Sequence, residues 1–327
     1  MDVFWYALVG LLLAGYLALE SIDFGIGMLM PFADTEAGRV RMRRAIVPRF
    51  LANEVWLVAF GGLLFGALPV AEGELLRALR LPFLAVLCAW FLRDGALWFR
   101  PAYEGARWRR TWDIVLSAAS LVLAAGWGAV LGMLVRGLSV GPDGHSVAAA
   151  ADLVHPFTLL CAALAVAGCL RQGLLCAARS LPEGNPVRVG FGRLTRVLTP
   201  VLLLLPLLVV VAAAVVTDAP VVVGVVGVLT AAAVYASDRV QATGRTGAAL
   251  LLGAAPLVAL PVLVGAVNGT TVLATHSGQG GLELSRAIAD SGSLTLLAAI
   301  VLPALVPVTL GQFWFWRVFT GTGMQPR

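Results

Sequence analysis

Nine apolar stretches, each long enough to cross a bilayer as a helix, follow one another along this chain of 327 residues. Crossing about 30 Å of hydrocarbon takes roughly 20 mostly apolar residues in a helix. The predicted helices span residues 3–30, 46–70, 78–100, 112–136, 153–178, 194–216, 219–236, 247–267 and 293–319. The sixth and seventh are joined only by residues 217–220, which must form a tight turn. We expect an all-α polytopic membrane protein with one transmembrane domain, 1–327.

The composition excludes several classes of soluble protein. Hydrophobic residues make up 60% of the chain and charged residues only 13%, whereas a soluble domain carries about 25% charged residues. The net charge is +5, and every basic residue is an arginine. These arginines form short clusters between apolar stretches, which indicates membrane topology rather than a phosphate-binding surface. A soluble enzyme, a nucleic-acid binder and a disordered chain are therefore excluded.

The arginine clusters alternate along the chain. They follow the first, third, fifth, seventh and ninth predicted helices, and the intervening loops hold few. Arginine-rich loops stay in the cytoplasm, so the alternation predicts an odd number of spans, an outside N-terminus and a cytoplasmic C-terminus. The first stretch lacks a basic flank and a cleavage site, which favours a retained helix over a signal peptide. The longest outer loop, 268–292, is rich in Gly, Ser and Thr, and we expect it to be solvated and irregular.

Ionisable residues within the first three predicted helices are candidates for a functional site, because charge in hydrocarbon is costly. A rise of about 1.5 Å per residue places Asp23, Glu54 and Arg93 at one level, roughly 10 Å from the cytoplasmic face. Polar neighbours complete the candidate set: Glu20, Asn53 and Asp94. Two interpretations stay open. The set forms either a buried ion pair that braces the helices or a proton or ion pathway.

The histidines do not suggest a haem site. His145 and His276 fall in outer loops, and His155 opens the fifth predicted helix at the outer surface. A haem held in a membrane usually needs axial His or Met ligands, and no methionine lies at the depth of a histidine. We therefore expect this chain alone to bind neither haem nor metal.

Small residues within the helices predict packing rather than chemistry. The four cysteines lie in apolar stretches without a CxxC pair, so we interpret them as packing residues: Cys88, Cys161, Cys169 and Cys176. Two GxxxG pairs, Gly62/Gly66 and Gly128/Gly132, predict close helix approach.

Three segments in the first third carry a family signature. Residues 15–29 read GYLALESIDFGIGML, residues 53–57 read NEVWL before a Gly-Gly pair and an FGALP run, and residues 107–113 read RWRRTWD. Weaker similarities follow in the same order at 156–160, 293–296 and 313–317. Together these segments resemble subunit II of the cytochrome bd quinol oxidases, whose usual motifs are close to GFDFGVGML, NEVWL and RWR…WD.

The resemblance implies a fold and a function. The fold is two four-helix bundles with one peripheral helix, in a bacterial cell membrane. The expected partner is subunit I, which carries haem b, haem d and the quinol site, in a heterodimer that oxidises quinol, reduces dioxygen to water and takes protons from the cytoplasm. Subunit II supports assembly and is not catalytic alone. A small accessory subunit and membrane lipid are further expected partners.

Two departures from the family pattern leave alternatives open. Leu51 stands where the family usually has an aspartate of a proposed proton route, and Ser21-Ile22 replaces the usual Gly-Phe. A proton-coupled secondary transporter that uses Asp23, Glu54 and Arg93 is the alternative function, and a scaffold for subunit I is a third. The transporter predicts inverted repeats with matching breaks, but the helix prolines at 200, 206, 256, 261, 303 and 307 have no counterparts in the first four spans.

Overall fold

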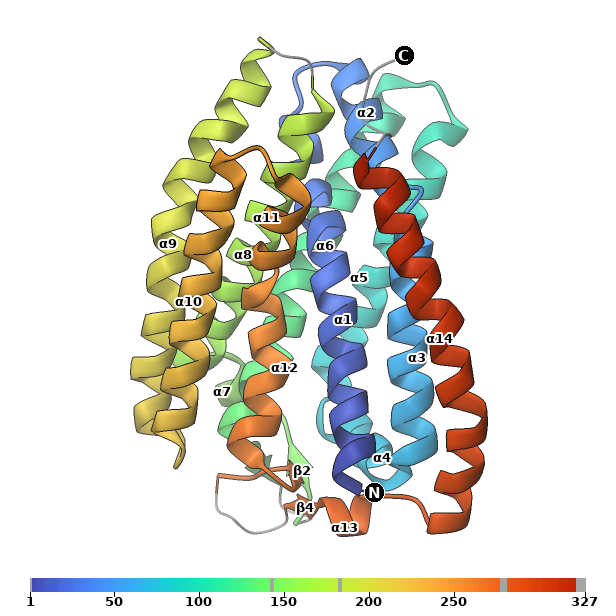
Figure 1. Cartoon of the computed structure of the whole chain (residues 1–327), viewed down its shortest axis with the longest axis vertical. Helices are drawn as coiled ribbons and strands as arrows, with labels where there is room; N and C mark the ends of the chain where they lie inside the picture. The colour runs from blue at the N-terminus through green and yellow to red at the C-terminus, as the bar shows by residue number, and fades with distance from the viewer. Residues whose placement is uncertain (1, 142–143, 182–183, 277–280, 322–327) are drawn as a thin grey trace.

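The computed structural model describes residues 2–141, 144–181, 184–276 and 281–321 (Figure 1). Within these residues, 9 helical segments are long and apolar enough to cross a membrane. They are Asp2–Phe32, Phe50–Ala67, Arg80–Ala102, Ala106–Arg136, Pro156–Arg179, Pro186–Val216, Pro220–Ala242, Thr246–Asn268 and Ser291–Trp314. The nine predicted spans are confirmed, and the tight turn before Pro220 is present as well.

The second predicted span, 46–70, is wrong at both ends. Its first residue, Ile46, ends a separate amphipathic helix, α2 (Glu36–Ile46), which is capped by Thr35 and buries Met42 and Ile46, and a turn over 47–49 follows. The spanning helix α3 is Phe50–Ala67, and α4 (Pro69–Ala78) follows after a single break at Leu68. Proline disfavours helical geometry in the residue before it, which explains the break. Hydropathy alone could not separate these three helices.

Two other spans begin earlier than predicted. α6 is Ala106–Arg136 and α9 is Pro186–Val216, so each helix continues beyond the apolar stretch into arginine-containing turns. The remaining helices are α1 (Asp2–Leu29), η1 (Met30–Phe32), α5 (Arg80–Phe99), η2 (Arg100–Ala102), α7 (Ala150–Leu153), α8 (Pro156–Ser180), α10 (Pro220–Ala242), α11 (Thr246–Gly253), α12 (Ala255–Asn268), α13 (Leu284–Ala287) and α14 (Ser291–Gly321). The strands are β1 (Ser139–Val140), β2 (Ser146–Val147), β3 (Thr271–Leu273) and β4 (Leu282–Glu283).

The spanning helices form two bundles and one outlying helix. α1, α3, α5 and α6 pack together, α8, α9 and α10 pack with the α11–α12 pair, and α14 lies along α3 (Figure 1). The bundles join where α1 and α6 pack on α8. The expected two four-helix bundles with a peripheral helix are confirmed.

Glycines bring the two bundles into contact. A Cβ on Gly25 of α1 would lie 1.9 Å from the carbonyl oxygen of Cys169 on α8, and one on Gly128 of α6 would lie 2.7 Å from the Cα of Ala162. The Gly128/Gly132 pair is therefore confirmed as a close helix contact. The Gly62/Gly66 prediction is wrong for Gly62, which has nothing within 4 Å of a built Cβ.

The segment after α12 has more structure than expected. β3 pairs with β4, α13 follows directly, and Leu273, Leu284 and Ala287 are buried. Val272, Leu284 and Ala287 pack with the start of α1 and the end of α3. The prediction of an irregular, solvated loop over 268–292 is wrong for these residues, because apolar side chains interrupt its polar sequence.

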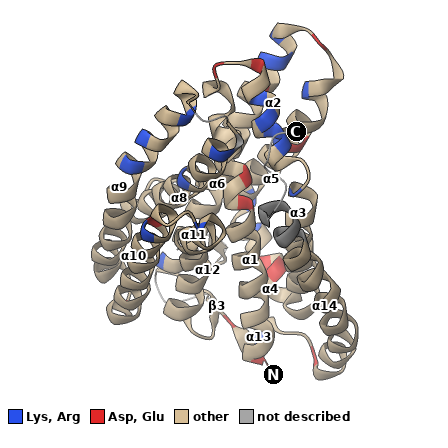
Figure 2. Ribbon diagram, turned by 45° about the horizontal axis from the view of Figure 1, so that its top comes forward, with Lys and Arg blue, Asp and Glu red and all other residues tan. Residues whose placement is uncertain are grey.

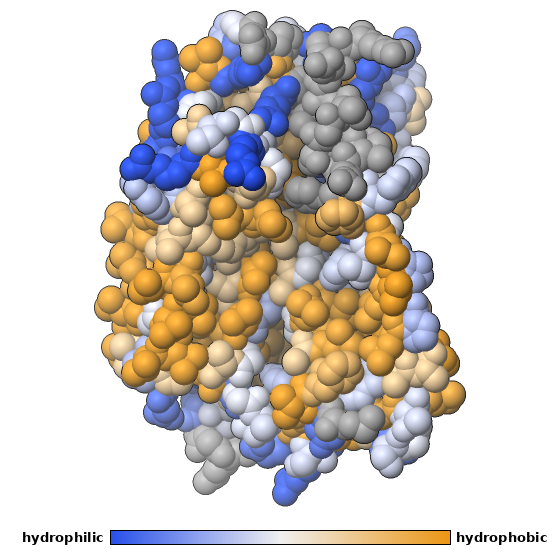
Figure 3. Space-filling view, viewed as in Figure 1, coloured by the Kyte–Doolittle hydropathy of each residue, from blue (hydrophilic) through white to orange (hydrophobic). Residues whose placement is uncertain are grey.

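The surface matches a membrane environment. An apolar band crosses the middle of the face shown in Figure 3, and hydrophilic residues lie at both of its ends. Arginines gather at the end that carries α2, which is also where α14 finishes, whereas α1 starts at the opposite end (Figures 1 and 2). Arg327, which the topology prediction also used, lies outside the described residues.

Candidate functional site

Arg93 on α5 is the centre of a buried charged cluster in the first bundle. Its side chain is 1% exposed, and its Nη1 donates hydrogen bonds to Glu54 at 2.7 Å and to Asp94 at 2.8 Å. Its Nη2 pairs with Glu20 of α1. The guanidinium carbon also lies 5.5 Å from the ring centres of Phe24 and Phe50, a distance at which an aromatic face attracts a cation. One arginine therefore joins α1, α3 and α5.

Asp23 pairs with Asn53 and lies near Arg49. Its Oδ2 accepts a hydrogen bond from Asn53 Nδ2 at 2.8 Å, and its Oδ1 lies 3.8 Å from Arg49 Nη2. Of the two carboxyl groups expected near Arg93, Glu54 pairs with it directly, and Glu20 rather than Asp23 takes the second position. Asp23 and Glu20 are three residues apart on α1, so both face the same side of the helix.

Of the three residues predicted at one level, Asp23, Glu54 and Arg93, Glu54 lies nearest to the end of its helix. Its Oε1 accepts hydrogen bonds from Arg93 and from Trp90 Nε1 at 2.9 Å. Because α3 begins at Phe50 rather than at residue 46, Glu54 lies only about 6 Å from its start, whereas Asp23 and Arg93 lie about 9 Å from their helix ends. All six candidate residues nevertheless gather in one cluster at the end of the bundle that carries α2.

Three members of this cluster were absent from the sequence-based set. Arg49 had been counted only among the topological arginines, and Trp90 and Gln312 had not been singled out. Gln312 of α14 donates to Asn53 Oδ1 at 3.1 Å. Its signal in the sequence was an uncharged polar residue inside an apolar stretch, which often marks a contact between membrane helices.

The family of the chain follows from comparison with known proteins. The model of cytochrome bd terminal oxidase subunit II matches residues 1–319. The chain belongs to this family. The structure of bd oxidase from Geobacillus thermodenitrificans shares the fold, with a TM-score of 0.77 at 16% identity over 98% of this chain and 99% of that chain.

Two relatives in the subunit II family match part of the chain. Cytochrome bd ubiquinol oxidase subunit 2 of Bacillus subtilis (strain 168) is 31% identical over 172 residues, which is 52% of this chain and 51% of that protein. Cytochrome bd-I ubiquinol oxidase subunit 2 of Escherichia coli (strain K12) is 32% identical over 176 residues, which is 52% and 46%. The chain spans about half the length of these curated relatives.

The position at which this family member departs from the usual motif lies outside the cluster. Leu51 is 56% exposed on the surface of α3, whereas Asn53 and Glu54 are buried. The other departure is internal, since Ser21 and Ile22 are both buried and Ser21 Oγ donates to the Ala18 carbonyl at 2.6 Å. The loss of a carboxylate at position 51 therefore leaves every contact described above in place.

A second charged cluster ties the ends of α2, α5 and α6 together in this subunit II fold. Arg100 donates to both oxygens of Asp113, at 2.5 and 3.2 Å, and to both oxygens of Glu36, at 3.1 and 3.0 Å. Arg109 also pairs with Glu36 at 3.3 Å. Asp113 closes the RWRRTWD motif, so this motif anchors α2 to the bundle.

The opposite end of the molecule carries a buried aspartate. Asp152 Oδ1 accepts from Arg136 and contacts His276 Nε2, both at 2.9 Å, and its Oδ2 accepts from the amides of Ser139 and Ala149. Burial acts to raise the pKa of Asp152, but the hydrogen bonds from His276 and these neighbours lower that pKa to about 2. The charged carboxylate thus connects the two loops at this end of the molecule.

The three histidines all lie outside the spanning helices. His155 Nδ1 accepts the Phe157 amide at the start of α8, and burial, followed by the charge of Arg136, lowers the pKa of His155. Among the described residues, no group of three or more His, Cys, Asp or Glu could hold a metal ion. Cys161, Cys169 and Cys176 are buried and unbridged, and Cys88 is exposed.

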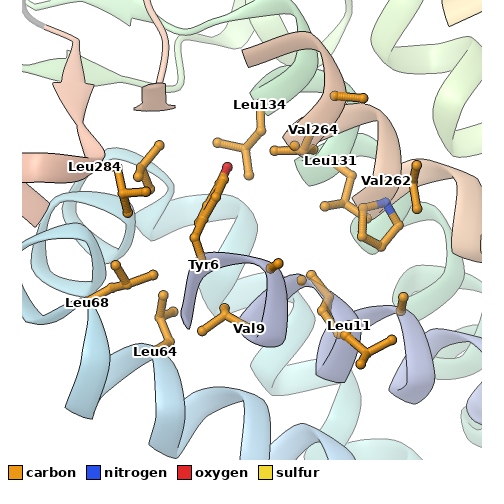
Figure 4. A pocket seen from close by; sticks show the side chains of 18 of the residues that line it. Tyr6, Val9, Leu11, Leu64, Leu68, Leu131, Leu134, Val262, Val264 and Leu284 are labelled. Carbon is orange, nitrogen blue, oxygen red and sulfur yellow. The ribbon is translucent and has the colours of Figure 1, made fainter. Parts of the chain in front are cut away.

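One cavity among the described residues is apolar. It has a volume of about 640 Å³ and lies between α1, α3, α6 and α12 at the end opposite the charged cluster (Figure 4). Leucine and valine side chains line it, and the Tyr6 hydroxyl points into it (Figure 4). Such a lining can accommodate apolar chains but offers no acid–base chemistry.

Proposed function

We propose that this chain is subunit II of a bd-type terminal oxidase, which with subunit I oxidises quinol and reduces dioxygen to water. The family membership and the shared fold support this proposal. We further propose that the chain lies in a bacterial cell membrane as a single transmembrane domain, with its N-terminus outside and the α2 end in the cytoplasm. In this proposal haem b, haem d and the quinol site belong to subunit I, and the position of all three histidines outside the spanning helices of the described residues supports the assignment of the haems.

The observation that carries the chemical part of the proposal is the buried cluster around Arg93. Four carboxyl groups, those of Glu20, Asp23, Glu54 and Asp94, face two guanidinium groups, those of Arg49 and Arg93. An excess of buried negative charge is unfavourable in a medium of low dielectric constant, so protons bind to relieve it. The cluster can therefore take up and release protons while the arginines stay charged.

The positions within the cluster suggest an order of transfer. Asp94 is the most exposed of the four carboxyl groups, with 23% of its side chain accessible, and Glu54 lies next to it across Arg93. Glu20 is fully buried on the far side of the same guanidinium. A proton entering at Asp94 or Glu54 would thus reach Glu20 and Asp23 by short steps, and from there the partner subunit. Support of assembly is the second proposed role, since Arg93 and Asn53 connect helices.

Two isosteric variants test the proton role. Glu54→Gln and Asp23→Asn should leave the haem content of the assembled oxidase near the parental level while slowing quinol oxidase turnover and proton uptake. Parental turnover in both fully assembled variants would overturn the role. Failure of both to assemble would instead favour a bracing ion pair. Proton-coupled transport by the isolated chain in vesicles, without subunit I, would favour the transporter.

A further inference from the structure

Gln312 links the peripheral helix α14 to the charged cluster. Only 6% of the spanning window of α14 is buried, so apolar burial holds this helix weakly. Its Gln312 side chain nevertheless reaches α3 and donates to Asn53 Oδ1 at 3.1 Å. Asn53 in turn donates from Nδ2 to Asp23 Oδ2 at 2.8 Å. Two amides therefore connect the outermost helix to a buried carboxyl group.

The chemistry of the groups fixes the direction of the two hydrogen bonds that link Gln312, Asn53 and Asp23. An ionised carboxylate can only accept hydrogen bonds, so Asn53 must turn its NH₂ group towards Asp23. Its carbonyl oxygen then faces Gln312, which must donate through Nε2. A flipped Asn53 would place an oxygen against the carboxylate and the Gln312 donor against a second donor. Gln312 thus stabilises the one orientation of Asn53 that suits an ionised Asp23.

The two oxygens of Asp23 differ as a result. Oδ2 is occupied by the Asn53 donor, whereas Oδ1 has no hydrogen-bond partner among the described residues, although it is buried. The nearest cation to Oδ1 is Arg49, with Nη2 at 3.8 Å. Oδ1 is therefore the oxygen at which an incoming proton does not compete with the Asn53 hydrogen bond.

We propose that Gln312 is a positioning residue for Asp23. It holds Asn53 so that Oδ2 remains an acceptor, and proton exchange takes place at Oδ1 on the side of Arg49. In this step a proton delivered by water binds to Oδ1, an O–H bond forms, and the carboxylate becomes a neutral acid with no change in oxidation state. The inference rests on the proposed proton role of the cluster and adds a residue from a helix outside both bundles.

The test compares two residues that line the same cavity of about 450 Å³ beside α14. Gln312→Leu keeps the size of the side chain and removes the donor. Thr309→Val is the matched control, because within the described part of the chain the Thr309 hydroxyl bonds to the Leu305 carbonyl of its own helix. Both variants are made in the assembled oxidase, and Asp23→Asn identifies the infrared carboxyl band of Asp23.

Two readouts are followed across pH: the protonated carboxyl band of Asp23 and the turnover rate. In Gln312→Leu, the pH midpoint of the band should rise by about half a unit, as expected for one weakened hydrogen bond to a charged group. The pH profile of turnover should move by the same amount, while Thr309→Val leaves both unchanged. If Gln312→Leu assembles poorly, Gln312→Met, which has a longer apolar side chain, replaces it in the same measurements.

The outcomes separate the two proposals. A band midpoint in Gln312→Leu and Gln312→Met equal to the parental one would overturn the positioning role, whatever the turnover. If Asp23→Asn and Glu54→Gln both turn over at the parental rate, the proton role itself fails. The band shift then still decides whether Gln312 acts on Asp23.

Discussion

Arg93 is the residue on which most of the buried charge in the first bundle depends. It contacts three carboxyl groups and is 1% exposed, so Arg93→Met would leave these groups without their shared cation. Removing one partner of a buried ion pair costs about 3–5 kcal/mol. We expect a loss of this size in the free energy of unfolding of the purified chain, measured by denaturation in mild detergent.

Arg77→Ala provides the control for this prediction. Arg77 pairs with Glu74 at the surface, where 39% and 31% of the two side chains are exposed. Exposed pairs of this kind contribute at most about 1 kcal/mol, so the control should change stability little. An equal loss of stability in the two variants would mean that Arg93 does not stabilise the buried cluster.

Asp152 makes stability depend on acid pH. Its ordinary pKa is 3.8, and hydrogen bonds lower that pKa to about 2 in the folded chain despite burial. A lowered pKa means that the ionised form favours folding, so this contribution is complete above about pH 4 and is lost as the pH falls towards 2. The stability difference between the parent and Asp152→Asn should therefore shrink over this range. Thermal unfolding of both proteins across this pH range measures the difference.

The exposed Asp218, in the turn between α9 and α10, supplies the comparison. Asp218→Asn should change the free energy of unfolding little, because the side chain is exposed. An Asp152→Asn difference that stays constant between pH 5 and pH 2 would contradict the role of the charged carboxylate.

The sequence predicted which residues lie in the charged cluster better than it predicted which of them contact one another. The six sequence-based candidates all lie in the cluster, because rise per residue gives the depth of a side chain in a membrane. Depth does not say which side chains meet at that level. Glu20 rather than Asp23 therefore meets Arg93, and Gln312, 259 positions beyond Asn53, could not be assigned to the cluster.

At the scale of elements, one glycine crossing determines how closely the two bundles approach. A Cβ at position 173 of α8 would lie 2.1 Å from the carbonyl carbon of Gly25, and backbone atoms cannot move aside as a side chain can. Overpacking costs about 1–3 kcal/mol, sometimes more. Gly173→Ala should therefore destabilise the chain by about 3 kcal/mol or more, measured as the free energy of unfolding.

Gly62→Ala on α3 is the matched substitution. Nothing lies within 4 Å of a Cβ built there, and alanine favours a helix interior over glycine by roughly 0.5–1 kcal/mol. This variant should unfold at or slightly above the parental denaturant concentration. A strong loss of stability in Gly62→Ala with no loss in Gly173→Ala would reverse the assignment of the close contact.

The sequence predicted the spanning helices but not the elements that lie on the surface. Apolar length sets the number and approximate limits of spans, which is why all nine were found. α2 has four arginines and only a narrow apolar face, so hydropathy does not reveal it. The GxxxG spacing likewise marks a possible close approach, but whether a second helix lies opposite depends on tertiary packing.

At the scale of the whole molecule, the distribution of arginine predicts the orientation in the membrane. The end that carries α2 also holds the α5–α6 and α8–α9 connections, and arginines are concentrated there (Figure 2). Contacts with other residues hold several of these arginines at this end. Arg43 donates to the Leu97 carbonyl, and Arg100 pairs with Asp113 and Glu36. Translocation of this end would carry the whole set across the bilayer, which the positive-inside rule disfavours.

A reporter that is active only outside the cytoplasm tests the orientation. Fused after Arg327 it should be silent, and placed in the 268–292 loop it should be strongly active. Two further positions act as internal controls: a fusion in the α8–α9 connection should be silent, and one after Thr217 should be active. The physical reason is the same at each site, because connections rich in arginine are retained and those poor in arginine are exported. The opposite pattern at all four positions would invert the topology and place the Asp94 entrance on the outer side.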